Sequence, residues 1–352
     1  MTPTNTILVT GAAGYLASWI VAQLLQAGHQ VHGAVRSLSD RTKIQHLLDL
    51  IDLHPGQLTL FEADLLQPGS FDTAMQGCTE VIHTASPYFL GKPKDPMREL
   101  VQPALEGTRN VLGSVNRSTS VKRVVLTSSV AALYDNACDV GAAVQHQVQE
   151  NDVNPNRDIH RNTYAYSKTV AEQAAWDLQR QQQRWDLVTI HPGAIFGPSL
   201  SKRVDASSVA MMVQFLNGSF RTGVPALWLG VVDVRDVAHA HVQAALLPAA
   251  RQRYIVVAKD LRLLEIAQHM HLGGLGIANK LPRSEAPKWL MWLLGPLLGL
   301  PRSYVARNVG HPVYFNNHRS QSELGLQYRA VSDTLNAHIR QILDDQLLVR
   351  VP

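Results

Sequence analysis

The chain has 352 residues, of which 45% are hydrophobic and 17% are charged. This composition is that of an ordinary globular protein and excludes a disordered chain or a fibrous array. The net charge of +4 is mild, and no run of basic residues is interleaved with aromatics, so nucleic-acid binding has no support.

The cysteines and the N-terminal residues favour a reducing compartment. Cys78 and Cys138 are far apart and lack metal-ligand spacing, and residues 1–6 lack the basic and apolar regions of a signal peptide. We therefore expect a cytoplasmic protein without a metal ion.

The most apolar stretch covers residues 289–300. It is broken by Gly and Pro and is too short to cross a bilayer. We expect a buried or lobe-covering helix here, with an interfacial membrane contact or the wall of an apolar substrate pocket as alternatives.

Strand and helix patterns alternate through the first half of the chain. Residues 6–10 form a short apolar run, and residues 15–27 have a helical period that ends at Gly28. Further strands are expected at 30–35, 57–62, 79–84, 122–128 and 187–191, and helices at 43–50, 70–76, 97–115 and 164–183. This alternation predicts an α/β fold with a doubly wound parallel sheet of the Rossmann type.

The alternation fades near Gly197. A strand is expected at 254–258, and helices near 236–247 and 331–348. We predict a dinucleotide-binding domain over residues 1–196, to which a segment near 228–250 returns, and a smaller C-terminal substrate-binding lobe over residues 197–352. Bulky side chains in the lobe are consistent with an apolar pocket but are more often core: Met211, Met212, Phe215, Phe220, Trp228, Trp289 and Trp292.

A glycine-rich turn separates the first strand from the first helix. Small residues let backbone amides approach a pyrophosphate at a helix N-terminus, where free N–H groups and the helix dipole favour anions. The turn therefore predicts a dinucleotide in contact with Gly11, Gly14, Tyr15 and Leu16.

The residues after the second strand bear on which dinucleotide binds. NAD-preferring chains usually carry an acid there, whereas NADP needs a cation for its 2′-phosphate. Arg36 holds that place, Lys43 follows, and residues 33–37 contain no acid, so we predict NADP(H) in preference to NAD(H). Arg36 could instead be a solvated loop cation. After the third strand, Asp64 and Leu65 could contact the adenine, or Asp64 could cap a helix near Ser70.

A second motif is Tyr164-Ala165-Tyr166-Ser167-Lys168. Residues four apart share a helix face, so the Lys168 ammonium can lie near the Tyr164 phenol and favour loss of its proton. A phenol tuned in this way can exchange a proton with a carbonyl oxygen near neutral pH.

In this order the motifs resemble the extended short-chain dehydrogenase/reductase superfamily. The branch is that of dihydroflavonol reductases, cinnamoyl-CoA reductases and microbial aldehyde and ketone reductases, and the resemblance covers nearly the whole chain. It rests on residues 9–19, 35–36, 43 with 46–50, 83–87, 107–112, 127–129, 164–168, 192–193 with 197–198, and 232–238.

The resemblance implies an NADP-linked carbonyl reductase with three catalytic residues. Ser129 would hydrogen-bond the substrate oxygen, Tyr164 would donate the proton, and Lys168 would bind the nicotinamide ribose. Ser128 is the rival for the serine role, because side-chain alternation lets only one of the two hydroxyls face the pocket. The remaining cofactor contacts would come from Thr84, Ala85, Ser86, Ser128, Pro192 and Ile195.

Two departures from the branch narrow the substrate. Residues 162–168 lack the Asn-Trp-Tyr-Cys-Tyr-Gly-Lys signature of cinnamoyl-CoA reductases. This difference weakens the case for a thioester as the substrate. Residues 130–135 are closer to microbial carbonyl reductases than to the segment with a substrate-orienting Asn in dihydroflavonol reductases, so a flavonoid is not supported.

We expect a monomer or homodimer that reversibly reduces a small, apolar aldehyde or ketone. The alternatives on the same fold are a sugar-nucleotide epimerase or dehydratase, a hydroxysteroid dehydrogenase/isomerase and, with less support, a non-enzymatic cofactor sensor.

Several polar residues are expected to be structural. Asp233 and Asp236 would fix a turn and cap the following helix, and His83 and His191 would be structural or line the pocket. Asn110 would either join a relay behind the lysine or make a packing hydrogen bond.

Overall fold

The computed structural model describes residues 4–86, 95–140, 147–155, 158–271 and 278–349. Pro87, which belongs to one of the family motifs, lies outside these ranges.

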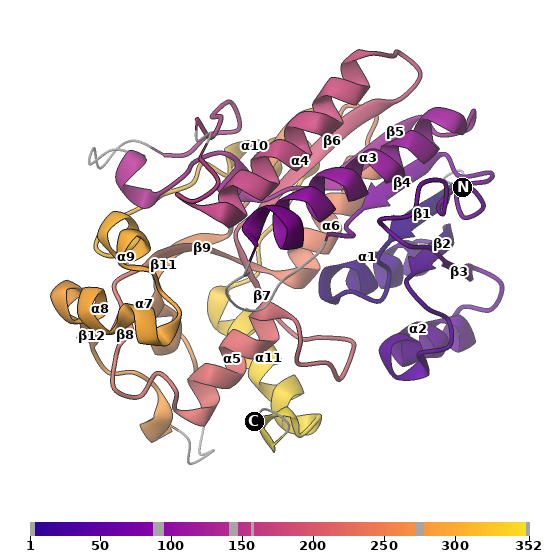
Figure 1. Ribbon diagram of the computed structural model, residues 1–352. Helices are drawn as coiled ribbons and strands as arrows, with labels where there is room; N and C mark the ends of the chain where they lie inside the picture. The colour runs from indigo at the N-terminus through magenta and orange to yellow at the C-terminus, as the bar shows by residue number, and fades with distance from the viewer. Residues whose placement is uncertain (1–3, 87–94, 141–146, 156–157, 272–277, 350–352) are drawn as a thin grey trace.

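Seven parallel strands form the central sheet (Figure 1). The order across the sheet is β3 (Leu58–Glu62), β2 (Gln30–Val35), β1 (Thr6–Thr10), β4 (Glu80–His83), β5 (Arg123–Thr127), β6 (Asp186–Pro192) and β10 (Gln252–Val256). The central strands are buried on both faces, as their runs of Val, Ile and Leu require. The predicted α/β class and doubly wound sheet are confirmed.

The strand order reverses at β1. This strand pairs with β2 on one side and with β4 on the other, in parallel in both cases. In open α/β sheets, ligands bind outside the carboxyl ends of the strands at such a reversal. The glycine turn after β1 and the residues after β4 meet at this place.

Helices cover both faces of the sheet (Figure 1). On one face α3 (Gln102–Arg117) packs along α4 (Thr163–Arg180). On the other, α1 (Tyr15–Gln26) packs along α6 (Val234–Leu246), and α2 (Arg41–Leu53) lies beside α1 and β3. Both α6 and β10 come from beyond residue 197, so the later part of the chain returns to the large sheet. The division into two domains stays a prediction.

The C-terminal part holds two small sheets and a second core. One sheet contains β7 (Ala194–Phe196), β9 (Trp228–Asp233) and β11 (Lys259–Arg262), and the other contains β8 (Val224–Pro225) and β12 (Glu285–Ala286). The helices are α5 (Ser207–Asn217), α7 (Leu263–Gln268), α8 (Lys288–Leu294), α9 (Arg302–Asn308), α10 (His318–Leu324) and α11 (Val331–Asp344). Met212 and Phe215 are fully buried in this second core, so they pack the lobe and line no open pocket.

Two local expectations differ from the structure. Residues 70–76 form turns without a helix, because positive-φ glycines at 69 and 77 leave too few residues to repay helix nucleation. The segment expected at 97–115 begins with a π-helical turn, Met97–Val101, before α3 starts. Pro103 lies in the first turn of α3 and has no backbone N–H. It therefore cannot donate the hydrogen bond that would join α3 regularly to the preceding turn.

The apolar segment 289–300 is the largest departure. A buried or lobe-covering helix was expected, but the Trp289 side chain is 69% exposed and that of Leu297 is 84% exposed. Met291 alone of the α8 side chains is buried, where it packs against Val305 and Val309 of the α9 region. The expectation was wrong because a helix of seven residues can bury only one of its faces against the lobe. This segment carries apolar side chains on the outer face as well, and those stay exposed.

Candidate active site

The turn after β1 packs against the segment after β4. Gly11 has a φ of +64°, and a Cβ there would lie 3.1 Å from the Ala85 Cα. The Gly14 amide donates to the Gly11 carbonyl oxygen at 2.8 Å, and Gly14 caps the N-terminus of α1. Only glycine fits position 11 without strain or contact. The turn therefore fits the close approach of backbone to a pyrophosphate at a helix N-terminus.

Tyr15 and Leu16 point away from that turn. The Tyr15 hydroxyl donates to the Gly197 carbonyl oxygen at 2.6 Å, and Leu16 lies in the main core. Burial, together with the charge of Asp233, raises the pKa of Tyr15 above its usual range. Tyr15 thus ties the turn to the chain after β7, and cofactor contacts by either side chain stay predictions.

The loop after β2 carries the cations that were assigned to the 2′-phosphate. Arg36 is exposed, and no carboxylate of the described chain forms an ion pair with it. Lys43 lies on α2, 2.7 Å from Asp40, so part of its charge is offset. The Leu38 amide donates to Glu62 Oε2 at 3.0 Å, so an acid at the end of β3 fixes this loop. Glu62 is distant from position 36 in the sequence, so the local pattern of residues 33–37 could not reveal it.

Asp64 caps a turn after β3. Its carboxylate accepts a hydrogen bond from the amide two residues further on, at 2.8 Å, and its carbonyl accepts one from the Ser70 hydroxyl at 2.6 Å. Leu65 packs against Gly107 of α3, where a Cβ would come within 2.5 Å of the Leu65 side chain. Asn110 donates to the Leu65 carbonyl at 3.1 Å, which favours its reading as a packing residue.

The residues after β4 connect the glycine turn to α4. The Thr84 hydroxyl donates to the Thr10 carbonyl at 2.6 Å, and the Ala85 amide donates to the Thr10 hydroxyl at 3.2 Å. The next residue, Ser86, has its Oγ 3.4 Å from Lys168 Nζ. The segment therefore touches both motifs that the sequence placed far apart.

Tyr164 and Lys168 share one face of α4. Lys168 Nζ lies 6.0 Å from the centre of the Tyr164 ring, and the Tyr164 side chain is 43% exposed. The helix begins behind Asn162, whose side-chain oxygen accepts a hydrogen bond from the Ala165 amide at 3.2 Å. This cap fixes the first turn, which carries the phenol at an open position.

The two adjacent serines after β5 have different partners. The Ser128 hydroxyl donates to Glu172 Oε2 at 2.5 Å, and both side chains are buried. Ser129 Oγ accepts from the Ala131 amide at 3.2 Å, which caps a short 3-10 turn and leaves its hydrogen available for donation. The geometry favours Ser129 over Ser128 as a donor to a substrate.

Glu172 is a buried carboxylate that sequence analysis did not single out. Besides the Ser128 hydroxyl, two further groups contact its carboxylate. His191 Nε2 lies 2.8 Å from Oε2, and Arg253 Nε lies 2.7 Å from Oε1. Burial alone would raise the pKa of Glu172, but His191, Arg253 and Ser128 outweigh it and lower the pKa to about 2. Its partners come from β5, β6 and β10, so no local spacing could have revealed it.

A small cavity lies directly behind the lysine. It has a volume of about 20 Å³ and its lining includes His83, Thr108, Ser128, Lys168 and Glu172. A space of this size accommodates one water molecule. Burial and the Lys168 charge lower the pKa of His83 to about 3, so His83 is neutral near pH 7.

The last two predicted cofactor residues flank the end of β6. Pro192 ends this strand and is buried, and Ile195 in β7 is half-buried beside the main core. Pro192 therefore lies at the carboxyl edge of the large sheet, on the strand next to β5, and Ile195 lies on β7 of the neighbouring small sheet.

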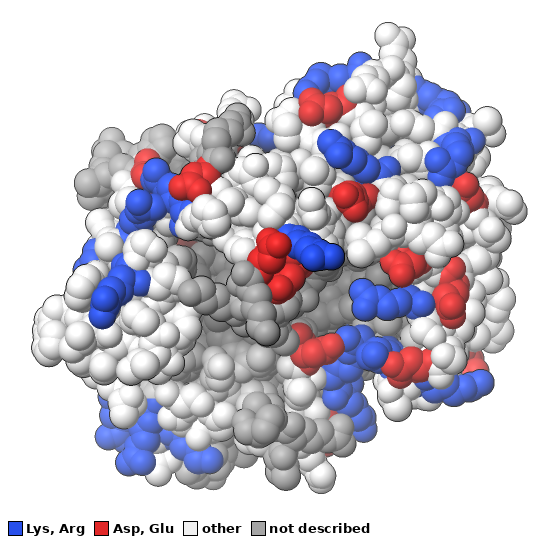
Figure 2. Space-filling view, in the orientation of Figure 1, with Lys and Arg blue, Asp and Glu red and all other residues white. Residues whose placement is uncertain are grey.

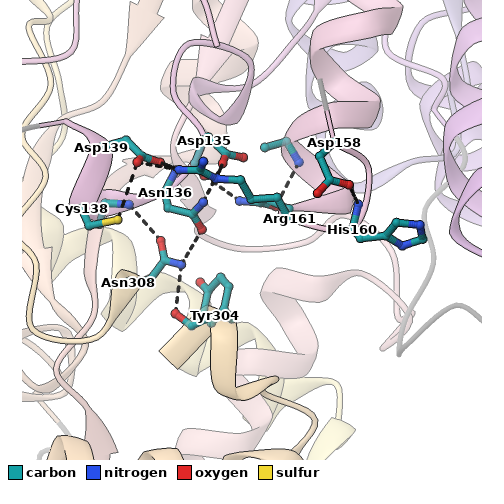
Figure 3. A network of polar contacts seen from close by, with 12 residues as sticks. Asp135, Asn136, Cys138, Asp139, Asp158, His160, Arg161, Tyr304 and Asn308 are labelled. Atoms are coloured by element: carbon teal, nitrogen blue, oxygen red, sulfur yellow. Dashed lines mark hydrogen bonds and ion pairs between the residues drawn. The ribbon is translucent and has the colours of Figure 1, made fainter. Parts of the chain in front are cut away.

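A polar network anchors the start of α4 to the C-terminal part (Figure 3). Arg161 forms an ion pair with the buried Asp135, and the Asn162 side chain donates to the Asp135 carbonyl at 2.7 Å. Asn136 donates to the Asp135 carboxylate at 2.7 Å and accepts from Asn308 of α9 at 2.9 Å. The phenol-bearing turn is therefore held by residues from both halves of the chain.

The acids before and within α6 are structural, as expected. Asp233 accepts from the Arg235 amide at 2.7 Å and caps α6, and Asp236 pairs with Arg329. Among the residues with described positions, no group of three or more His, Cys, Asp or Glu side chains could hold a metal ion. Nor does this part of the chain contain a helix long and apolar enough to cross a bilayer.

The strand order and the site define a dinucleotide-binding α/β protein with a Tyr/Lys pair beside the glycine turn. A model of the NAD dependent epimerase/dehydratase family matches residues 7–258, and the chain belongs to this family. The expected membership of the extended short-chain dehydrogenase/reductases is confirmed, as is NAD(P)-dependent oxidoreductase chemistry.

Several proteins to which the chain is similar are named as reductases. The chain is 34% identical to cinnamoyl-CoA reductase CAD2 of Medicago truncatula over 342 residues, which cover 96% of this chain and 95% of the relative. It is 34% identical to an anthocyanidin reductase of Vitis vinifera over 275 residues, covering 76% and 80% of the two chains. It is also similar to the yeast methylglyoxal/isovaleraldehyde reductase Gre2 in complex with NADPH. That comparison has a TM-score of 0.78 and 27% identity, and covers 97% of this chain and 99% of the other.

Proposed function

We propose that this chain is an NADPH-dependent reductase that converts an aldehyde or ketone into an alcohol, with Tyr164 as the proton donor. One observation carries the proposal. Gly11 contacts Ala85, and the next residue, Ser86, reaches Lys168, which shares a helix face with Tyr164. These contacts support a single site that contains both the dinucleotide turn and the acid.

The proposed roles follow from where charge develops. A bound NADPH supplies the hydride, and negative charge then grows on the former carbonyl oxygen. Tyr164 donates a proton to that oxygen, and Ser129 donates a hydrogen bond to it. Lys168 holds a positive charge beside the phenol, which favours the tyrosinate left after the transfer.

The proposed cofactor preference rests on the loop after β2. Arg36 is exposed and has no carboxylate partner in the described part of the chain, so its guanidinium is available to a 2′-phosphate. The yeast and Candida albicans Gre2 structures contain NADPH, which is consistent with this choice.

The substrate class is a small apolar carbonyl compound. The chain resembles reductases with different substrates, so a panel of aldehydes and ketones assayed with NADPH and with NADH tests the proposal. We expect net NADPH oxidation, at a higher kcat/KM than with NADH. Conversion of a UDP-sugar without net oxidation would show an epimerase instead, and cofactor binding without turnover of any substrate would show a sensor.

The proposed acid is tested by Tyr164→Phe. We expect kcat to fall by about 10²–10⁴-fold, because general-acid transfer contributes that much, while the Kd for NADPH stays nearly unchanged. Tyr166→Phe is the matched control, since Tyr166 lies in the same turn of α4 and is half-buried. Full activity in Tyr164→Phe, or an equal loss in the control, would contradict the assignment.

A further inference from the structure

The C-terminal part presents an exposed apolar surface at the tip formed by α8 and the 3-10 turn Gly295–Leu298. We define the tip surface by its six exposed apolar side chains: Trp289, Trp292, Leu293, Leu294, Leu297 and Leu298. They are contiguous in sequence apart from Leu290-Met291 and Gly295-Pro296, and their exposed fractions run from 41% to 84%. Contiguous apolar patches of this kind mark binding surfaces on water-exposed proteins.

The inner side of the same segment is already packed. Met291 is buried against Val305 and Val309, and Ala226 and Ala286 complete that small core. The exposed residues therefore lie on the outer side of this segment, where the Arg302 side chain lies over the Trp292 ring. Only an external partner could bury the side chains of the tip surface away from solvent.

The charges around the tip surface identify the chemistry of that partner. Residues 278–311 contain five Lys or Arg and one acid, a net charge of +4, while the remaining 27 basic and 27 acidic residues balance. The one acid, Glu285, is neutralised by Arg262 from β11 at 3.3 Å. Figure 2 shows the protrusion over α8, at the left of the view, as white with blue side chains beside it.

Individual cations flank the apolar side chains. The Arg302 guanidinium lies over the Trp292 ring, 4.5 Å from its centre, and Arg283 and Lys288 are exposed. None of these three forms an ion pair with a carboxylate in the part of the chain that the structure places. Protein segments that combine Trp and Leu with nearby Lys and Arg are typical of those that bind in the headgroup region of anionic membranes.

We propose that the tip surface docks the protein onto an anionic lipid bilayer, with the Trp and Leu side chains in the headgroup region and the cations on the lipid phosphates. A second copy of this chain fits less well. A two-fold contact would place two tip surfaces of the same positive sign face to face, where like charges repel. The proposal does not depend on the proposed reductase activity.

Flotation of the full chain with vesicles tests the docking. We expect binding to phosphatidylcholine vesicles that contain roughly one third phosphatidylglycerol, much weaker binding to pure phosphatidylcholine, and release by high salt. The emission of the wild-type protein should shift to the blue on binding, and the shift should shrink in Trp289→Phe. Absence of flotation and of any emission shift for the wild type would overturn the proposal.

Paired variants separate the two contributions. Arg283→Gln with Arg302→Gln should lower binding by about tenfold or more, because each cation near an anionic surface contributes about fivefold. Leu297→Ser with Leu298→Ser should lower binding to a similar degree. The matched controls are Lys122→Gln with Arg340→Gln, which are exposed cations elsewhere, and Leu53→Ser at the exposed end of α2.

The controls should float like the wild type. Loss of binding in the controls as well would overturn the assignment to the tip surface. So would light scattering that shows a dimer in the wild type and a monomer in the Leu297→Ser, Leu298→Ser variant, because the surface would then be an interface between copies.

Discussion

Gly11 combines a left-handed backbone with a close contact, and Gly28 has the first property without the second. Both have positive φ, but a Cβ at Gly28 would meet nothing within 4 Å. We expect Gly11→Ala and Gly28→Ala each to lower the free energy of unfolding by about 1–2 kcal/mol through strain. Only Gly11→Ala should also weaken NADPH binding, because its methyl group would push against Ala85.

Urea unfolding and NADPH titration of the two glycine variants measure these effects separately. If Gly28→Ala weakened NADPH binding as much as Gly11→Ala, the contact with Ala85 would have no part in the cofactor site.

Arg36 and Lys43 should contribute unequally to cofactor choice. Arg36 has no acidic partner in the placed residues, whereas Lys43 lies 2.7 Å from Asp40. A charge-assisted hydrogen bond contributes about 1.5–3 kcal/mol, so Arg36→Gln should lower the ratio of kcat/KM for NADPH over NADH by about tenfold or more. Lys43→Gln should lower it less. A ratio that is unchanged in Arg36→Gln would show that Arg36 is only a solvated loop cation.

Single residues of the cofactor turn were readable from the sequence because their signal is local. Gly11 and Gly14 stand between a strand and a helix, and that context alone predicted the turn. The cofactor contact of Tyr15 stays a prediction. The hydrogen bond from its hydroxyl to the Gly197 carbonyl spans 182 positions, and no short motif encodes it.

The helix α4 is held at its start and at its middle. Arg161 and Asn162 bind the Asp135 segment at its start, and Glu172 binds Ser128 and Arg253 further along. The spacing of Tyr164 and Lys168 predicted a helix with both side chains on one face. It could not predict the anchors, because their partners lie far from α4 in the sequence, in the segment after β5 and on β10.

Glu172 predicts a pH dependence of stability. Its pKa is lowered to about 2 from an ordinary value of 4.5, so the ionised carboxylate stabilises the fold above about pH 4.5, and this contribution is lost as the pH falls toward 2. Removing one partner of a buried ion pair costs about 3–5 kcal/mol. Glu172→Gln should therefore be destabilised by about 3 kcal/mol at pH 7, and by less at pH 3.

Urea unfolding at several pH values, with the exposed Glu106→Gln as control, measures this difference. A destabilisation of Glu172→Gln that is constant from pH 7 to pH 3 would show that packing, and not charge, is what the substitution removes.

At the scale of the whole molecule, the fold was predictable only in the part of the chain where helices and strands alternate regularly. The alternation of strands and helices predicted the parallel sheet, whereas the strand order with its reversal at β1 is known only from the structure. The sequence did not reveal that β10 extends this sheet, because β10 pairs with β6 over more than 60 positions. For residues 289–300 a buried helix was favoured and an interfacial segment was only an alternative, since an apolar run looks the same in the sequence whether it packs inside or meets an external surface.

In the proposed reaction, hydride passes from NADPH to a carbonyl carbon at the site built from Gly11, Ser86, Lys168 and Tyr164. Mass spectrometry of the product formed with NADPH deuterated at both C4 positions tests it most directly. We expect one deuterium on the carbinol carbon and one NADPH oxidised for each alcohol formed, with the rate of both lowered about 10²–10⁴-fold in Tyr164→Phe. Product without deuterium, or turnover without net NADPH oxidation, would contradict it.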